Sequence, residues 1–214
     1  MLFEIFLFVD PLCKECEKSE KTVLKLSKDI DSKFKIQFIP IYNLKVIQTD
    51  FCHSNNKIKK VLSSNELYNL YHDVVLDYKA ALFQGMKNGK SFFMDMQNKI
   101  LDQGIKYTDS LSLETAKEHN LDIPMFEEDR RSSLAKNTVE EDQKIVKNMK
   151  IKKPASAVIF NCNKPNSGVL TSNVCYSGLF DACCNQDLTK DSLKDMMKES
   201  QKKSVKNSGF HIVK

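Results

Sequence analysis

Residues 3–16 read FEIFLFVDPLCKEC, an apolar run followed by a turn and two closely spaced cysteines. The run from Phe3 to Val9 is short and rich in phenylalanine, isoleucine and valine, which is typical of a buried strand. Asp10-Pro11 ends this strand, and residues 13–28 contain neither glycine nor proline, which favours a helix. The sequence therefore predicts a strand, a tight turn and a helix whose first turn carries Cys13-Lys14-Glu15-Cys16.

A second strand follows this helix. Phe34, Ile36 and Phe38 alternate with polar residues, and Pro40 closes the segment. Strand, helix and strand in this order predict a βαβ unit with parallel strands and a right-handed crossover.

The middle of the chain has the period of helices. Apolar residues recur there at steps of three and four, namely Leu67, Leu70, Tyr71, Val74, Val75, Tyr78 and Leu82. Gly85 and Gly89 are expected to end this helix. Further helices are predicted at residues 91–103, 112–120 and, in one or two pieces, 124–149. Thr138 and Glu141 match a capping box within the last of these segments.

Strand character returns after Pro154. Residues 155–161 and 169–174 form two such runs, and the turn-rich stretch between them predicts an antiparallel hairpin. A closing helix is predicted from Thr189 to Glu199. The sequence therefore predicts an α/β fold whose elements follow the order βαβ, then a helical block, then ββα. We expect one domain over residues 1–200, with an all-helical insertion at about 57–150 and a basic, flexible tail at 201–214.

Composition limits the classes of function. The 214 residues, 41% of them hydrophobic, are enough for one sizeable core. The net charge of +5 comes with no recognised nucleic-acid-binding motif, so no nucleic-acid partner is expected. The opening apolar run is too short for a membrane span and lacks a basic leader, so we expect no membrane attachment and a cytoplasmic location.

The two cysteines of the first helix are the candidate catalytic residues. In a reducing compartment most thiols stay free, and disulfides serve catalysis or sensing. The dipole at a helix N-terminus favours a thiolate, so Cys13 is the expected nucleophile and Cys16, one turn further in, the expected resolving cysteine. Lys14 would stabilise the Cys13 anion and Glu15 would oppose it, with a net effect that the sequence leaves open. Both roles require sulfurs that a protein substrate can reach.

Other interpretations of the cysteines were weighed. A zinc half-site needs two further ligands, but there is no second C-x-x-C pair and the four histidines are scattered, so no metal is expected. Cys13 and Cys16 as two inert core thiols remain an alternative. Cys52-His53 as nucleophile and base, and Cys183-Cys184 as a strained disulfide or soft-metal site, are less favoured. No role is assigned to Cys162, Cys175, Cys183 or Cys184.

The chain resembles the DsbA-like thioredoxin superfamily over nearly its whole length. The resemblance rests on residues 3–16, on the long helical insertion and on the segment Lys153-Pro154-Ala155-Ser156-Ala157-Val158-Ile159-Phe160-Asn161. The Asp-Pro-Leu-Cys opening is most similar to the cytoplasmic Gram-positive branch of SpxH (YjbH) adaptors and predicted dithiol-disulfide isomerases. The resemblance implies a thioredoxin-like fold with a large all-helical insertion between the second and third strands.

The resemblance also implies further site residues. Pro154 would be the cis-proline that faces the dithiol, with Lys153 beside it in substrate binding. Pro124 is the alternative candidate for the cis-proline, but its sequence context is typical of the start of a helix. The chain departs from the family pattern at Lys14-Glu15, where oxidants often carry proline or histidine, and at Lys153, where a small or β-branched residue is more usual.

Three functions follow from the resemblance. The first is a cytoplasmic thiol-disulfide oxidoreductase or isomerase that uses Cys13 and Cys16 on a protein dithiol or disulfide, without a cofactor. The alternative is an SpxH-like adaptor that binds an Spx-type regulator and delivers it to the ClpXP protease. A glutathione-dependent isomerase or transferase is a third class, but such sites usually need one serine or cysteine, and Cys16 counts against it.

Overall fold

The computed structural model describes residues 2–42, 62–163, 168–172, 174–184 and 209–213. Its elements in chain order are β1 (Leu2–Val9), α1 (Lys14–Asp29), β2 (Lys33–Pro40), α4 (Ser64–Phe83), α5 (Met86–Leu101), α6 (Asp109–Glu118), α7 (Ile123–Arg131), α8 (Ser133–Asn148), β3 (Ser156–Asn161), β4 (Gly168–Ser172), α9 (Tyr176–Cys184) and β5 (Gly209–Val213). The chain forms two compact units, one of residues 1–7, 18–37 and 155–214 and the other of residues 8–17 and 38–154. The expectation of one domain over residues 1–200 stays a prediction.

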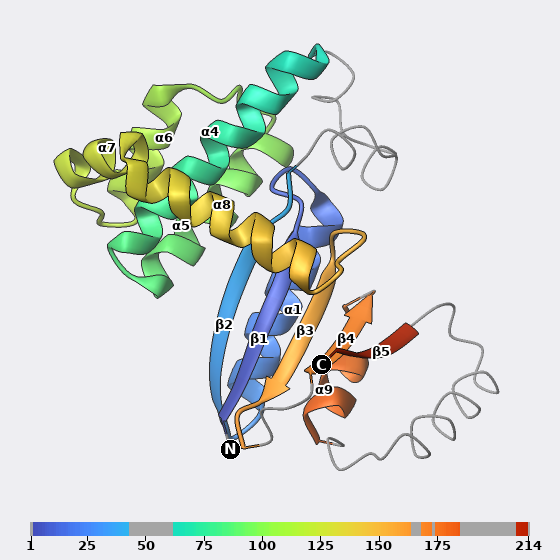
Figure 1. The fold of residues 1–214 in the computed structure, drawn as a ribbon. Coiled ribbons are helices and arrows are strands. Elements are labelled where there is room, and N and C mark those ends of the chain that lie inside the picture. The colour runs from blue at the N-terminus through green and yellow to red at the C-terminus, as the bar shows by residue number, and fades with distance from the viewer. Residues whose placement is uncertain (1, 43–61, 164–167, 173, 185–208, 214) are drawn as a thin grey trace. The chain divides into compact units, whose positions relative to one another are not determined.

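The strands form one sheet in the order β2-β1-β3-β4-β5 (Figure 1). β3 and β4 pair antiparallel, with Ser156 opposite Ser172, as the hairpin prediction required. The α/β fold with a helical insertion between its second and third strands is therefore confirmed. The sequence analysis missed helix α9.

The predicted tail at residues 201–214 includes a strand among its described residues, and its flexibility stays a prediction. Gly209–Val213 forms β5, which pairs antiparallel with β4 and places Ile212 opposite Val169. The physical reason is that β4 has a second edge whose backbone groups need partners, and a short segment with Phe210 and Ile212 in alternation can supply them. The predicted closing helix at residues 189–199 lies outside the described residues.

The first unit has its core between sheet and helices. Its fully buried side chains alternate along β1 and recur on α1, β3 and α9, and include Phe3, Ile5, Leu7, Val23, Leu26, Val158, Ile159 and Leu179. α9 packs against β3 and β4. The period of two in residues 3–7 is thus the pattern of a strand with one face in the core.

The helical block α4–α8 belongs to the second unit. Its core is largely aromatic and includes Tyr71, Tyr78, Phe92, Phe93 and Phe126, all fully buried. Ser63 caps α4, because its hydroxyl accepts the Glu66 N–H while the Glu66 carboxylate accepts the Ser63 N–H. The helical stripe at residues 67–82 therefore predicted α4 correctly, with the aromatic side chains turned inward.

Two details of the block differ from the predictions. Gly89 does not end a helix but lies inside α5, where a Cβ atom would meet the Leu82 backbone at 2.8 Å, so its role is to let α4 and α5 approach closely. Thr138 is not a cap either. It lies within α8 and donates to the Leu134 carbonyl, while Ser132 caps that helix.

The predicted cis-proline is wrong. None of the described peptide bonds is cis, and Lys153 and Pro154 are both described, so the bond between them is trans. The chain changes direction instead at Ala155, which has a φ of 54°. This left-handed conformation is unusual for a residue with a Cβ atom, and Ala155 adopts it directly before β3.

Candidate dithiol site

Cys13 lies directly before α1 and caps it with its carbonyl group. The Cys16 N–H and the Glu17 N–H donate to the Cys13 carbonyl oxygen at 3.1 Å and 3.2 Å. α1 begins at Lys14, so Cys16 lies in its first turn. The predicted geometry of the motif at the helix N-terminus, Cys13 outermost and Cys16 one turn further in, is therefore present.

Asp10 organises the turn that leads into the motif. Its carboxylate oxygen Oδ1 accepts the Leu12 N–H at 2.8 Å, and its own N–H donates to the Cys16 sulfur at 3.2 Å. The side chain is 1% exposed. The sequence analysis saw in Asp10 only the end of a strand, because its contact with Cys16 depends on how the turn folds back over the helix.

The two sulfurs are in different states. Cys13 takes part in a disulfide, while Cys16 is a free thiol, so the bond is not the one within the motif. Cys13 is 1% exposed and Cys16 is fully buried. The expectation that a macromolecule can reach these sulfurs is therefore not met in this state of the protein, in which Cys13 is already bonded.

The side chains between the cysteines point to different partners. Lys14 forms an ion pair with Asp102, at the end of α5, and the hydrogen bond with this carboxylate raises the pKa of Lys14. The Glu15 carboxylate oxygen Oε2 lies 3.3 Å from the Cys13 sulfur. The sequence left open whether Lys14 or Glu15 dominates at Cys13. The structure favours Glu15, because its carboxylate lies beside the Cys13 sulfur while Lys14 pairs with Asp102.

We expect Glu15→Gln to speed the alkylation of Cys13 in the reduced protein at neutral pH, by about two- to fivefold, because the variant removes a negative charge close to the sulfur. The measurement is the iodoacetamide reaction followed by mass spectrometry of the Cys13 peptide. Lys14→Gln is the matched control and should change the rate less, since Lys14 is paired with Asp102. Equal effects of the two variants would contradict this prediction.

Pro154 and Lys153, the predicted substrate-binding residues, belong to the second unit. Pro154 is buried and Lys153 is exposed, and their part in substrate binding stays a prediction. Cys162 and Cys175 are exposed free thiols, and Cys183 is a buried one. Cys52, His53 and the side chain of Cys184 lie outside the described residues. The described residues contain no group of three or more side chains that could hold a metal ion.

Tyr71 of α4 is a residue near the motif that the sequence analysis assigned only to the core. It is fully buried. Burial raises the pKa of Tyr71 well above its usual value, and the charges of Asp10 and Cys16 raise it further. No sequence signal points to this contact, because Tyr71 also fits the helical stripe of the core.

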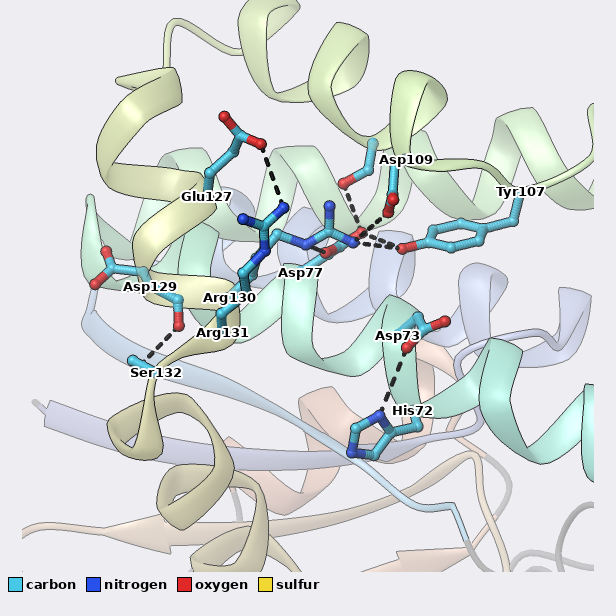
Figure 2. Close-up of polar contacts among 11 residues, drawn as sticks. His72, Asp73, Asp77, Tyr107, Asp109, Glu127, Asp129, Arg130, Arg131 and Ser132 are labelled. Carbon is cyan, nitrogen blue, oxygen red and sulfur yellow. Dashed lines mark hydrogen bonds and ion pairs between the residues drawn. The ribbon is translucent and has the colours of Figure 1, made fainter.

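A second buried polar cluster joins α4, α6 and α7 (Figure 2). Asp77 is fully buried and receives the Arg130 Nε at 2.8 Å, the Tyr107 hydroxyl at 2.7 Å and the Ser112 hydroxyl at 2.5 Å. Arg130 also contacts the exposed Asp109 at 3.0 Å. Burial raises the pKa of Asp77 to about 6, although Arg130 opposes this shift. The donors come from α6, from α7 and from the segment before α6, so the cluster links these parts of the block to α4.

Comparison with known proteins gives the following matches. A family model described as thioredoxin matches residues 6–181. The ClpXP adapter protein SpxH of Bacillus cereus (strain ATCC 14579) is 29% identical over 186 residues, which is 78% of this chain and 62% of that protein. The SpxH of Bacillus subtilis (strain 168) is 27% identical over 190 residues, with 78% and 61% covered. The chain thus spans about six-tenths of the length of these curated relatives.

Solved structures with the same fold are more distant in sequence. A putative protein disulfide isomerase from Nitrosomonas europaea superposes with a TM-score of 0.64 at 11% identity, covering 87% of this chain and 99% of that one. The cytosolic disulfide reductase DsbM from Pseudomonas aeruginosa gives a TM-score of 0.54 at 9% identity, covering 75% and 86%. At these identities the likeness concerns the fold. Among the described helices, none combines the length and the apolar character that a membrane crossing needs.

Proposed function

Because this chain belongs to the thioredoxin family, we propose that it is a thiol-disulfide oxidoreductase or isomerase that acts on protein substrates through Cys13 and Cys16. The observation that carries the proposal is the position of the two sulfurs at the start of α1. Cys13 precedes the helix and Cys16 follows one turn later, which gives an outer nucleophile and an inner resolving thiol.

The proposed cycle ends with a resolving step. Cys16, which is buried and takes part in no disulfide, is the candidate thiol for it. In that step the Cys16 sulfur bonds to the Cys13 sulfur, and the former partner of Cys13 leaves as a thiol. We propose that the reduced form attacks substrates, because Cys13 is buried in the form in which it takes part in a disulfide. No organic cofactor or metal is required, and we propose a cytoplasmic location.

A trapping experiment tests the proposal. We expect reduced Cys16→Ser protein, incubated with a protein disulfide such as insulin, to accumulate a mixed disulfide at Cys13, because the thiol that would release the substrate is gone. Non-reducing electrophoresis and peptide mass mapping measure the adduct and its position. Cys183→Ser is the matched control, since Cys183 is another buried free thiol, and it should accumulate none. Adducts found only on the exposed Cys162 or Cys175 would refute the assignment.

An adaptor is the second candidate function. It is favoured by the SpxH relatives, which are 29% and 27% identical to this chain and match 78% of it. In this case the partner would be an Spx-type regulator together with the ClpXP protease, and the dithiol would serve as a sensor. The burial of both sulfurs is compatible with this role, which does not need turnover at Cys13.

A further inference from the structure

Three aromatic rings meet where β2 ends. Tyr42 follows this strand, while Tyr68 and His72 lie one turn apart on α4. The centroid of the Tyr42 ring lies 5.8 Å from that of Tyr68 and 6.2 Å from that of His72, and the rings are inclined at 48° and 69°. Tilted and edge-to-face arrangements at these distances are favourable contacts between aromatic rings. We call Tyr42, Tyr68 and His72 the aromatic cluster.

The aromatic cluster is anchored on one side and open on the other. Tyr42 packs against a small apolar core of α4 and α8, formed by Val75, Leu76, Ala135 and Val139. Tyr68 is 37% exposed, and so is the His72 side chain. The rings are therefore held in place from within, while two of them present surface that another molecule can contact.

Two carboxylates accompany the rings. The Oδ1 atom of the half-exposed Asp73 lies 3.6 Å from the Nδ1 atom of His72 (Figure 2). Glu140 is exposed and directly follows Val139, a residue of the core against which Tyr42 packs. Burial raises the pKa of Tyr42 to about 12, and the charge of Glu140 contributes to this shift. Carboxylates and the faces of aromatic rings both attract positive charge, so the surroundings of the cluster favour a cation.

The described part of the chain leaves this position for a cation open. The described lysines that lie over aromatic rings are Lys25, Lys79 and Lys90, and each of them lies over a ring outside the cluster. Since a lysine or arginine side chain gains free energy over an aromatic face, the cluster offers a binding position that a side chain of another protein can use.

The cluster lies in the second unit at the same end of β1 and β2 as the dithiol. The Ile41 N–H donates to the Val9 carbonyl oxygen at 2.7 Å, so the residue before Tyr42 is paired with the last residue of β1. Cys13 comes four residues after Val9, so the Cα atoms of these two residues are at most about 15 Å apart. A short extended peptide covers such a distance, and a polypeptide engaged at Cys13 can therefore reach the cluster.

We propose that the aromatic cluster binds a lysine or arginine side chain of the protein substrate, a few residues away from the cysteine on which the dithiol acts. The rings contact the cation and the apolar stem of the side chain, and Asp73 and Glu140 supply the opposite charge. This rests on the proposed oxidoreductase function, and it narrows the substrates to proteins whose reactive cysteine has a basic residue nearby.

Binding is measurable without turnover. The probe is the peptide acetyl-Gly-Arg-Gly-amide, and its matched partner carries citrulline, which has nearly the shape of arginine but no charge. At pH 8, where an ordinary imidazole is neutral, we expect the arginine peptide to shift the NMR signals of the Tyr42 and Tyr68 rings and to bind about two- to fivefold more tightly than the citrulline peptide. Equal affinities, or shifts confined to rings outside the cluster, would overturn the proposal.

The reaction with Cys13 tests the link to the dithiol. The substrates are peptides whose single cysteine is bonded to thionitrobenzoate, with arginine or citrulline about two to six residues away, so that attack by Cys13 releases the chromophore. The protein is used reduced and in a Cys162→Ser/Cys175→Ser background, which removes the exposed thiols. We expect the arginine peptides to react about two- to fivefold faster at one or more spacings, and Tyr68→Ala to abolish this preference.

Phe83→Ala is the matched control. Phe83 is 37% exposed like Tyr68 but lies at the other end of α4, so its variant should keep the preference for arginine. Asp73→Asn combined with Glu140→Gln should weaken the preference and tests the charge separately from the rings. A parent protein without preference at any spacing, or an unchanged preference in Tyr68→Ala, would overturn the proposal alone. Release that does not depend on Cys13 would instead refute the proposed function, and the peptide titration would still decide whether the cluster binds a cation.

Discussion

Cys13→Ala is expected to reduce insulin-disulfide turnover to the uncatalysed rate, a loss on the order of 10³-fold or more, because the variant removes the proposed nucleophile. The measurement is the turbidity of reduced insulin with dithiothreitol as electron donor. Cys183→Ser, which removes a buried cysteine outside the motif sequence, should keep the activity and serves as the control. Retained turnover in Cys13→Ala would contradict the oxidoreductase function.

The same variant separates the enzyme from the adaptor. If the protein presents an Spx-type regulator to ClpXP, Cys13→Ala should still accelerate proteolysis of that regulator in a reconstituted assay. Loss of insulin turnover together with retained acceleration would assign both functions to one chain. An unmodified protein without effect on proteolysis would exclude the adaptor function that the SpxH relatives suggest.

Arg130→Met is expected to destabilise the protein by about 3 kcal/mol near pH 8, because it leaves the fully buried Asp77 without its counter-charge. The variant keeps the length and apolar stem of the arginine, so lost packing contributes little. Urea unfolding followed by circular dichroism measures the effect. Arg131→Met is the matched control, since Arg131 is exposed and pairs only with Glu127 at 3.6 Å, and it should change stability little (Figure 2).

The pH dependence of this effect has a definite sign. Asp77 has a folded pKa of about 6 against an ordinary 3.8, so the folded protein holds the proton more tightly than the unfolded chain. The stability that this group contributes is full below about pH 4 and is lost as the pH rises through about 6. Without Arg130 the pKa of Asp77 rises further, so the variant should be much less destabilised near pH 5. A pH-independent loss would contradict this account.

The parts of the fold that could be predicted are those determined by local pattern. The apolar run of residues 3–9, the break at Asp10-Pro11 and the following stretch without glycine or proline are enough to predict β1, the turn and α1. The stripe at residues 67–82 likewise predicts α4. In both cases the spacing of apolar side chains indicates which face of the element is buried, without any knowledge of the contacts made by distant residues.

The parts that could not be predicted depend on contacts between distant residues. Glycine is common at helix ends, so the sequence predicted an end at Gly89. The close approach of the Leu82 backbone explains why a glycine lies inside α5 instead. The charge balance at Cys13 depends on Asp102, far along the chain, which engages Lys14. The expected cis bond at Pro154 is absent, because whether an X-Pro bond is cis depends on the surrounding fold and not on a local pattern.

The order of the sheet has a consequence for biosynthesis. β1 lies between β2 and β3, and β3 begins at Ser156, so the first strand gains its second neighbour only after the entire helical block has been translated. Until then the phenylalanine-rich β1 presents a bare edge on the ribosome, the kind of segment that pairs with other nascent chains. Expression of this protein should therefore benefit from low temperature and from chaperones that bind exposed strand edges.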